Sequence, residues 1–216
     1  MRTCAAILLA FACAAEGQRA ADRLAVSVDR NAIFESEILD QIRVVAFLED
    51  REPDYSRESR RAAAERLIEL TLIRREMEIS RFTPPSPQEA LPLLAAFRKT
   101  QYADDAKYRQ ALAARDLREE DLLENLLAQL TLTRFIAFRF RPGIQVLEAE
   151  SRDYYQKEYL PVWRKARPAE EAPPFEDVVT DIETVLAERK VDQALDVWLK
   201  TARATSRIIY RSEVFE

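Results

Sequence analysis

The sequence predicts a mostly α-helical protein with a small sheet that joins its two ends. Apolar residues recur every three or four positions along most of the 216-residue chain, which is the spacing of helices with one buried face. Strand patterns are confined to Leu24–Val28, where apolar and polar residues alternate, and to Arg207–Tyr210. Two short strands alone are marginally stable. We therefore expect them to pair as a two-stranded sheet backed by the helices, so that the chain ends close a single domain over 22–216.

The first part of the chain contains two predicted helices. After a turn at Asp29–Asn31, apolar residues at helical spacing predict a helix over about 35–49. A loop around Pro53 follows. A second helix is predicted over about 58–81, and its leucines and isoleucines point in nearly every direction, which is typical of a buried helix. We expect this helix to be the central element.

The middle of the chain begins with a proline-rich segment, 84–87, which ends the second helix. Ser86 can cap the next helix, over about 87–100. Further helices are predicted over about 104–114 and 119–140, and Pro142-Gly143 ends the second of them. The inner stripe of the helix over 87–100 is expected to consist of Leu91, Leu94 and Ala95, and the core face of the helix over 119–140 of Leu122, Leu123, Leu126, Leu127 and Leu130.

The last third of the chain has a helix over about 148–160 that we expect to stop at Pro161, a charged and proline-rich linker over 164–174, and a long helix over about 175–204. The long helix is expected to pack back on the N-terminal part. Its apolar residues change face half-way, so it either contacts two different partners or breaks near Arg189. The first stripe consists of Val178, Ile182, Val185 and Leu186, and the second of Val191, Leu195, Trp198 and Ala202.

Residues 1–15 have the pattern of a cleaved secretory signal. Arg2 precedes a short apolar run, Ala5–Ala15, which is too short to span a bilayer as a stable helix. Two small-x-small motifs near its end offer cleavage sites. A lipid anchor on Cys13, which would tether the protein to a membrane, and a cytosolic helix with an apolar start are the alternatives. Because Cys4 and Cys13 are the only cysteines, we expect no disulfide in the cleaved chain.

Composition argues against several classes of activity. Gly17 and Gly143 are the only glycines, so phosphate-cradling loops and dinucleotide fingerprints are missing. The chain has no histidine, which removes Ser-His and Cys-His nucleophile pairs and the commonest imidazole metal ligand. A net charge of -5 argues against nucleic acid as a partner. We predict no catalytic residues, no metal and no cofactor.

Several motifs follow one another in an order that resembles a known family, although each alone is only degenerate apolar spacing. They are VSVDRNAIFESEI (26–38), AAAERLIELTLIRREM (62–77), Tyr108 and Leu112 followed by the acidic run Asp116–Asp121, the pair Tyr154-Tyr155, and the helix that begins at Phe175, reaches Trp198-Leu199 and leads to Ile208. This order resembles the non-catalytic part of SurA-type periplasmic chaperones and parvulin-type peptidyl-prolyl isomerases.

The chain departs from the family in ways that bear on function. The resemblance places an isomerase domain between the Tyr-Tyr helix and the final helix, but only about 20 residues separate them here, too few for a stable domain. The family's catalytic histidines are missing too. Phe34 and Leu147 stand where the family has a Ser or Thr helix cap. The resemblance therefore implies a periplasmic chaperone module without its catalytic insert.

Unfolded polypeptides would be bound by exposed aromatic side chains, because these give large contact areas with limited geometric demand. The alternative for each residue is packing in the core. Arg139 and Arg141 alternate with two of the aromatics, so part of that helix end is expected to face water. The candidate peptide-binding residues are Phe97, Tyr102, Tyr108, Phe135, Phe138 and Phe140.

The partner predicted by this resemblance is an unfolded or nascent exported polypeptide, including one bound for the outer membrane. Two other classes stay open: an assembly subunit dedicated to one partner helix, and a non-catalytic helper of a separate isomerase. The acidic clusters Glu119–Asp121 and Glu148–Glu150 suggest acid–base chemistry, but the macrodipole at a helix start explains both. The sequence does not determine the oligomeric state.

Overall fold

The computed structural model describes residues 22–102 and 104–215. The predicted signal over 1–15 and Cys13 lie outside these residues. The strands are β1 (Leu24–Val28), β2 (Asn31–Phe34) and β3 (Ile208–Tyr210). The α-helices are α1 (Glu35–Leu48), α2 (Arg57–Ile79), α3 (Leu91–Gln101), α4 (Asp105–Ala114), α5 (Glu119–Phe140), α6 (Glu148–Tyr154), α7 (Leu160–Ala166) and α8 (Phe175–Thr205), and a π-helical turn, Tyr155–Tyr159, joins α6 to α7.

The fold is mostly α, as predicted, and its one described sheet joins the two ends of the chain. β1 pairs antiparallel with β3, with Val26 opposite Tyr210 and Val28 opposite Ile208. The sheet has three described strands in the order β2-β1-β3 rather than the expected two. The additional strand, β2, forms because Asp29 takes a positive φ of 53°, which Asp tolerates better than most residues, and the chain turns straight back along β1.

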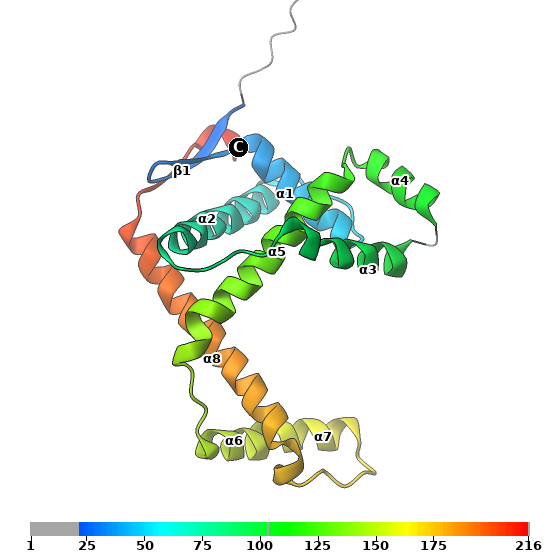
Figure 1. Ribbon diagram of the computed structural model, residues 1–216, viewed down its shortest axis with the longest axis vertical. Helices are drawn as coiled ribbons and strands as arrows, with labels where there is room; N and C mark the ends of the chain where they lie inside the picture. Colours follow the sequence, from blue (N-terminus) through cyan, green and yellow to red (C-terminus); the bar gives the residue numbers. More distant parts are fainter. Residues whose placement is uncertain (1–21, 103, 216) are drawn as a thin grey trace, which may run out of the picture.

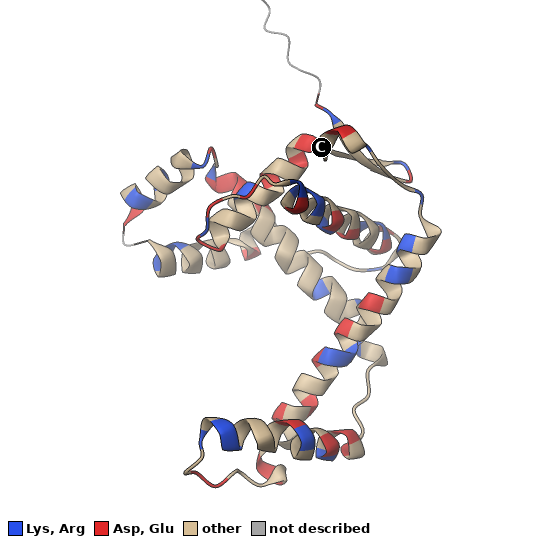
Figure 2. Cartoon of the chain, turned by 180° about the vertical axis from the view of Figure 1, so that it is seen from behind, with Lys and Arg blue, Asp and Glu red and all other residues tan. Residues whose placement is uncertain are grey.

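The elements form two regions (Figure 1). We call the sheet, α1 to α5 and the C-terminal half of α8 the body. We call α6, the π-turn, α7 and the N-terminal half of α8 the lower lobe. α8 runs through both regions, and a second connection leads from α5 to α6. Charged residues are spread along α8, whereas the middle of α5 carries none (Figure 2).

The core of the body has two parts. One contains buried residues of β1, β2, α1 and α2 together with Val214 and Phe215 near the C-terminus, and Ile68 of α2 is fully buried in it. The other lies where α1, α3, α4 and α5 meet and is built around Phe47 and Leu122. α2 is thus central, as predicted, but Leu67 and Leu70 on one of its sides are only half-buried.

The lower lobe differs from prediction at Pro161, which does not end a helix. The chain stays helical through the π-turn and α7 to Ala166, and the non-helical linker covers only 167–174. An ordinary α-turn would bring the proline ring against the carbonyl group of Lys157. The wider π-turn changes the position of that carbonyl group, so we attribute the helical continuation to it.

α8 is continuous and contacts two different partners, which resolves the alternative set by its change of face. Its first stripe packs on the tyrosines of α6 and the π-turn. Its second stripe reaches the body, where Trp198 packs edge-on against Phe140 of α5 with 6.2 Å between ring centroids. Val185 of the first stripe is 37 % exposed.

The helix starts at Phe34 and Leu147 lack a side-chain cap, as expected. In each case a glutamate three residues later accepts the backbone N–H instead: Glu37 from Phe34 at 2.7 Å and Glu150 from Leu147 at 2.8 Å. The expected inner stripe of α3 is wrong in part, because Leu94 is buried whereas Leu91 and Ala95 are exposed. In α5, Leu122 alone of the five expected core leucines is fully buried, and the other four are half-buried.

Candidate functional site

A groove runs along the half-buried side of α2. It consists of three neighbouring cavities of about 460, 590 and 280 Å³. Leu70 and Arg74 line all three, and Leu67 lines the first two. These shared residues make the cavities one continuous depression, which we call the α2 groove.

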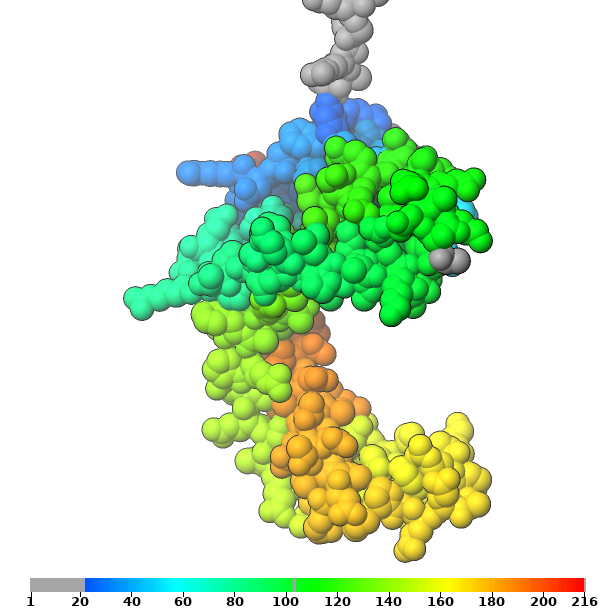
Figure 3. Space-filling model, turned by 45° about the vertical axis from the view of Figure 1, so that its right-hand side comes forward, coloured from blue at the N-terminus to red at the C-terminus, as the bar shows by residue number. Residues whose placement is uncertain are grey.

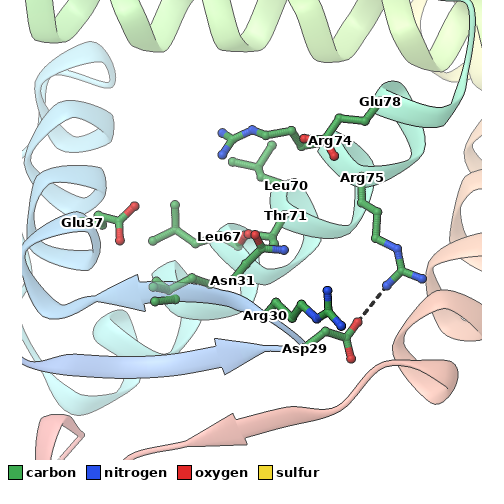
Figure 4. Close-up of a pocket in the computed structure, with 12 residues that line it drawn as sticks. Asp29, Arg30, Asn31, Glu37, Leu67, Leu70, Thr71, Arg74, Arg75 and Glu78 are labelled. Carbon is green, nitrogen blue, oxygen red and sulfur yellow. Dashed lines mark hydrogen bonds and ion pairs between the residues drawn. The ribbon is translucent and has the colours of Figure 1, made fainter.

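The α2 groove has an apolar floor and two unlike walls. At one end, β2 and the start of α1 form the wall, and Figure 4 shows Leu67, Leu70 and Thr71 of α2 beside the strand that carries Asn31. Along the other side, the wall is the middle of α5, which contributes Leu127, Ala128 and neighbouring residues. α5 has no charged residue over 125–133, so this part of the wall offers uncharged side chains to a bound chain. Glu124, which precedes this stretch, places a carboxylate at the wall.

Most charged groups at the rim are paired. Arg75 donates to Asp29 at 2.7 Å (Figure 4). Asp29 also accepts the backbone N–H of Arg207, and this bond is the main cause of its lowered pKa. In the part of the chain that the structure describes, Arg30 and Arg74 have no ion-pair partner, so the rim carries two free guanidinium groups.

A further rim pair lies where α5 begins. The side chain of Arg118 donates to Asp121 at 2.7 Å, and this hydrogen bond is the main cause of the lowered pKa of Asp121. Asp121 also accepts the backbone N–H of Arg118. In the second acidic cluster, Glu150 accepts the backbone N–H of Leu147, and its pKa is lowered first by this bond and then by Lys190. These two carboxylates therefore hold helix starts, in the role expected from the macrodipole.

The surface is also hollowed between the body and the lower lobe, as Figure 3 shows between the green part of the body and the yellow segment of α7. The lower lobe has a cavity of about 410 Å³ between α7 and α8, lined in part by Tyr159, Val162 and Trp163. Tyr159 and Trp163 stack with their ring centroids 6.0 Å apart. This second apolar surface is smaller than the α2 groove and separate from it.

The six predicted peptide-binding aromatics do not form one surface. Tyr108, Phe135 and Phe140 are buried, at 2 %, 1 % and 9 % exposure, so these three are core residues in this conformation. Phe97 and Tyr102 are half-buried and pack beside Phe47 and Tyr108. The pKa of the Tyr108 hydroxyl is raised above its ordinary value, mainly because the group is buried.

Phe138 is the only one of the six that is largely exposed, at 48 %, and it packs near Phe82 on the outer side of α5. None of the six lines the α2 groove. The groove residues were missed because the leucines and isoleucines of α2 point in nearly every direction, a pattern that predicts burial on every side. The arginines that interrupt it, Arg74 and Arg75, were the available signal that one side is open.

Residues 22–102 and 104–215 contain no cluster of three or more side chains suited to hold a metal ion. None of the helices described here combines the length and the apolar character needed to cross a membrane.

No family model matches the sequence, and no curated protein matches it either. The likeness to SurA-type chaperones therefore stays a prediction from the order of motifs.

Proposed function

We propose that the protein is an exported chaperone-type protein that binds unfolded or nascent polypeptides in the α2 groove without catalysing prolyl isomerisation. The proposal joins the motif order, which resembles the non-catalytic part of SurA-type periplasmic chaperones, to the groove geometry. In this function the protein acts by binding the unfolded state of a client and so lowering the concentration that is free to aggregate.

The groove itself is the observation that carries the proposal. Leu67 and Leu70 are large apolar side chains left half-exposed in the centre of the body, next to the best-packed core residues of α2. A soluble protein without a partner gains stability by burying such side chains. Their position in an open depression, between the uncharged stretch 125–133 of α5 and a charged rim, suits a binding surface for apolar segments of another chain.

The hollow between body and lower lobe supports the same function. Figure 3 shows it as open space between the two regions, which leaves room for part of a client outside the α2 groove. Exposed apolar residues outside the α2 groove are present in both regions, among them Phe138 of α5 and Val162 of α7. A client would then meet scattered apolar contacts and no single deep pocket.

Aggregation assays with several unrelated denatured proteins test the proposal. Wild-type protein should suppress their aggregation, and Leu70→Lys should weaken this about tenfold or more, because it places a charge on the apolar floor. Leu93→Lys is the matched control, since Leu93 is exposed and lies outside the groove; it should act like wild type. Equal loss in both variants, or no suppression by wild type, contradicts the proposal.

The same assays separate the alternatives. Binding of one envelope protein and of no denatured client would identify a subunit dedicated to one partner helix. Acceleration of a separate isomerase would identify a helper of that enzyme. Prolyl isomerisation by the pure protein above background would contradict the non-catalytic proposal. Recovery of the protein from the periplasmic fraction, with the N-terminal residues removed, is the expected localisation.

A further inference from the structure

The hydrogen-bond pattern of the sheet fixes which backbone groups of β2 point outward. The backbone N–H of Asp29 donates to the carbonyl oxygen of Arg207, and that of Arg211 donates to the carbonyl oxygen of Ala25. The backbone polar groups of residues 25, 27 and 29 therefore point toward β3. In an antiparallel sheet the two polar groups of a residue point to the same side and successive residues alternate. The backbone N–H and C=O groups of Val26 and Val28 therefore point toward β2, where Ile33 and Asn31 lie opposite them.

Ala32 lies between those two residues of β2, so its N–H and C=O point away from β1. The backbone N–H of Phe34, two residues further along, also points away from β1 and donates to the carboxylate of Glu37. Within 22–102 and 104–215, Ala32 has no hydrogen-bond partner outside the sheet. β2 is therefore an edge strand with one free donor and one free acceptor at its centre.

This free edge faces the α2 groove. Asn31, Ala32 and Ile33 line the same cavity as Leu67 and Leu70, and Figure 4 shows Leu67 beside the strand with Leu70 farther from it, toward Arg74. A chain paired with β2 would thus have an apolar surface under it. Exposed edges in soluble proteins are commonly blunted by shortness, by proline, by a bulge or by a covering loop. β2 has only four residues and its pairing with β1 contains a bulge between Leu24 and Val26, but within 22–102 and 104–215 Ala32 stays exposed.

The charges indicate what kind of chain fits. Of the three carboxylates at this end of the groove, Asp29 is engaged by Arg75 and Arg207, and Glu37 by the backbone of Phe34. The third, Glu78, has no ion pair among the described residues, so two free guanidinium groups stand against one free carboxylate. In the part of the protein that the structure describes, Arg30 and Arg74 have no partner carboxylate, although both line the cavity. An acidic side chain on the occupant would give these guanidinium groups the charge-assisted hydrogen bonds that they lack.

We propose that the α2 groove takes its client by strand addition: an extended segment of alternating apolar and polar residues pairs with β2 at Ala32, with its apolar side chains on Leu67 and Leu70 and an acidic side chain near Arg30 and Arg74. This inference rests on the proposed function and specifies the client segment. Main-chain pairing supplies affinity that is independent of sequence, and the alternating pattern supplies the preference.

Ala32→Pro tests the pairing because it removes only the outward N–H and leaves every bond between β2 and β1 in place. Proline is tolerated at an edge position of this kind. The probe is a fluorescent ten-residue peptide of alternating valine and threonine with one aspartate in place of a threonine. Ala32→Pro should weaken its binding about fivefold or more, from the loss of one hydrogen bond and the bulk of the ring. Ala32→Val, which keeps the N–H, should bind like wild type.

Peptide chemistry on the wild-type protein gives a test that no folding defect can affect. Two versions of the probe carry N-methyl groups on alternate residues, one on the odd and one on the even positions. Strand addition predicts that one version loses binding about tenfold and the other stays within about twofold, because only one set of N–H groups faces β2. Equal effects of the two methylation patterns would overturn the inference.

The charge preference is tested by replacing the aspartate of the probe with lysine. Wild type should bind the lysine peptide more weakly than the aspartate peptide. The double variant Arg30→Glu/Arg74→Glu should bind the lysine peptide more tightly instead. The control Arg66→Glu, on the exposed side of α2, should keep the wild-type preference. An unchanged order in the double variant would overturn the assignment of the acidic side chain. If wild type binds none of the peptides, the proposed function fails; if it binds them but ignores Ala32→Pro and the methylation pattern, strand addition alone fails.

Discussion

The body and the lower lobe are held together in different ways. In the body, the largest core cluster combines β1, α1 and α2 with Val214 and Phe215 from the other end of the chain. In the lower lobe, the buried cluster is three residues on one helix, Phe175, Val178 and Ile182, covered by tyrosines. The body therefore forms only when both ends of the chain meet, whereas the lobe depends on a small interface between α8 and the segment from α6 to α7.

Ion pairs supplement the small core of the lobe. Arg189 of α8 donates to both carboxylate oxygens of Glu158 at 2.9 and 2.8 Å. Lys190 donates to the carbonyl of Gln145 and to Glu150, each at 2.7 Å. Surface pairs of this kind contribute little stability each. We infer that the groove lies in the more stable region and that the lobe is the part that opens first.

The largest expected effect is that of Ile68→Ala. Ile68 is fully buried in the body, so the substitution leaves a cavity and should lower the free energy of unfolding by about 3 kcal/mol. Urea titration followed by circular dichroism measures this change. A loss below about 1 kcal/mol would contradict the assignment of α2 as the central element.

Ile182→Ala makes the same deletion in the lobe and serves as its comparison. It should leave the main urea transition nearly unchanged and instead speed hydrogen exchange over α6 and α7, because local opening there does not require the body to unfold. An equal shift of the main transition by both variants would show that the two regions unfold as one unit.

The next largest expected effect is a change in how the stability of the fold depends on pH. Glu65 of α2 accepts a hydrogen bond from Tyr210 of β3 at 2.7 Å and pairs with Arg203 of α8. Burial opposes its ionisation, but these bonds outweigh burial and lower its pKa below the ordinary 4.5. The ionised group therefore stabilises the fold above about pH 4.5, and this contribution disappears as the pH falls through the lowered pKa.

Glu65→Gln should accordingly reduce stability at pH 7 and flatten its dependence on pH between about 5 and 3. Thermal unfolding at a series of pH values measures this. Glu69→Gln is the control, because Glu69 is one turn further along α2 and reaches Arg203 only at 4.0 Å. Parallel curves for wild type and Glu65→Gln would contradict the role of this carboxylate in closing the chain ends.

The smallest effect is expected for Arg189→Gln. Both partners of its pair are about half exposed, so the main unfolding transition should not move measurably. Hydrogen exchange over the π-turn should become faster, because the two bonds to Glu158 are lost. Unchanged exchange there would show that the tyrosine packing alone holds the lobe.

Much of the fold could be predicted because its signals are local. The apolar spacing and the charged start of α5 located that helix. The change of face in α8 predicted either two partners or a break near Arg189, and the structure decided between them. β2 was missed because only the positive φ at Asp29 turns NAIF back along β1, and that conformation leaves no apolar pattern. The predicted helix end at Pro161 was wrong because a proline normally ends a helix, whereas here a π-turn accommodates it. No sequence pattern indicates that π-turn.

The candidate site was harder to predict for a physical reason. Aromatic residues bind partners and fill cores for the same reason, their large apolar area, so the sequence could not separate Phe138, which is exposed, from Phe135, which is buried. The α2 groove depends on the positions of α1 and α5 around Leu70, which are set by tertiary packing. Only the structure brings these helices together.

The most direct test follows leucine methyl groups by NMR while an unfolded polypeptide is added to the wild-type protein. The account predicts that the methyl signals of Leu67 and Leu70 shift with the bound fraction while those of Leu93 stay in place. Shifts at Leu93 with Leu67 and Leu70 unchanged would show that clients bind elsewhere and would contradict the α2 groove as the binding site.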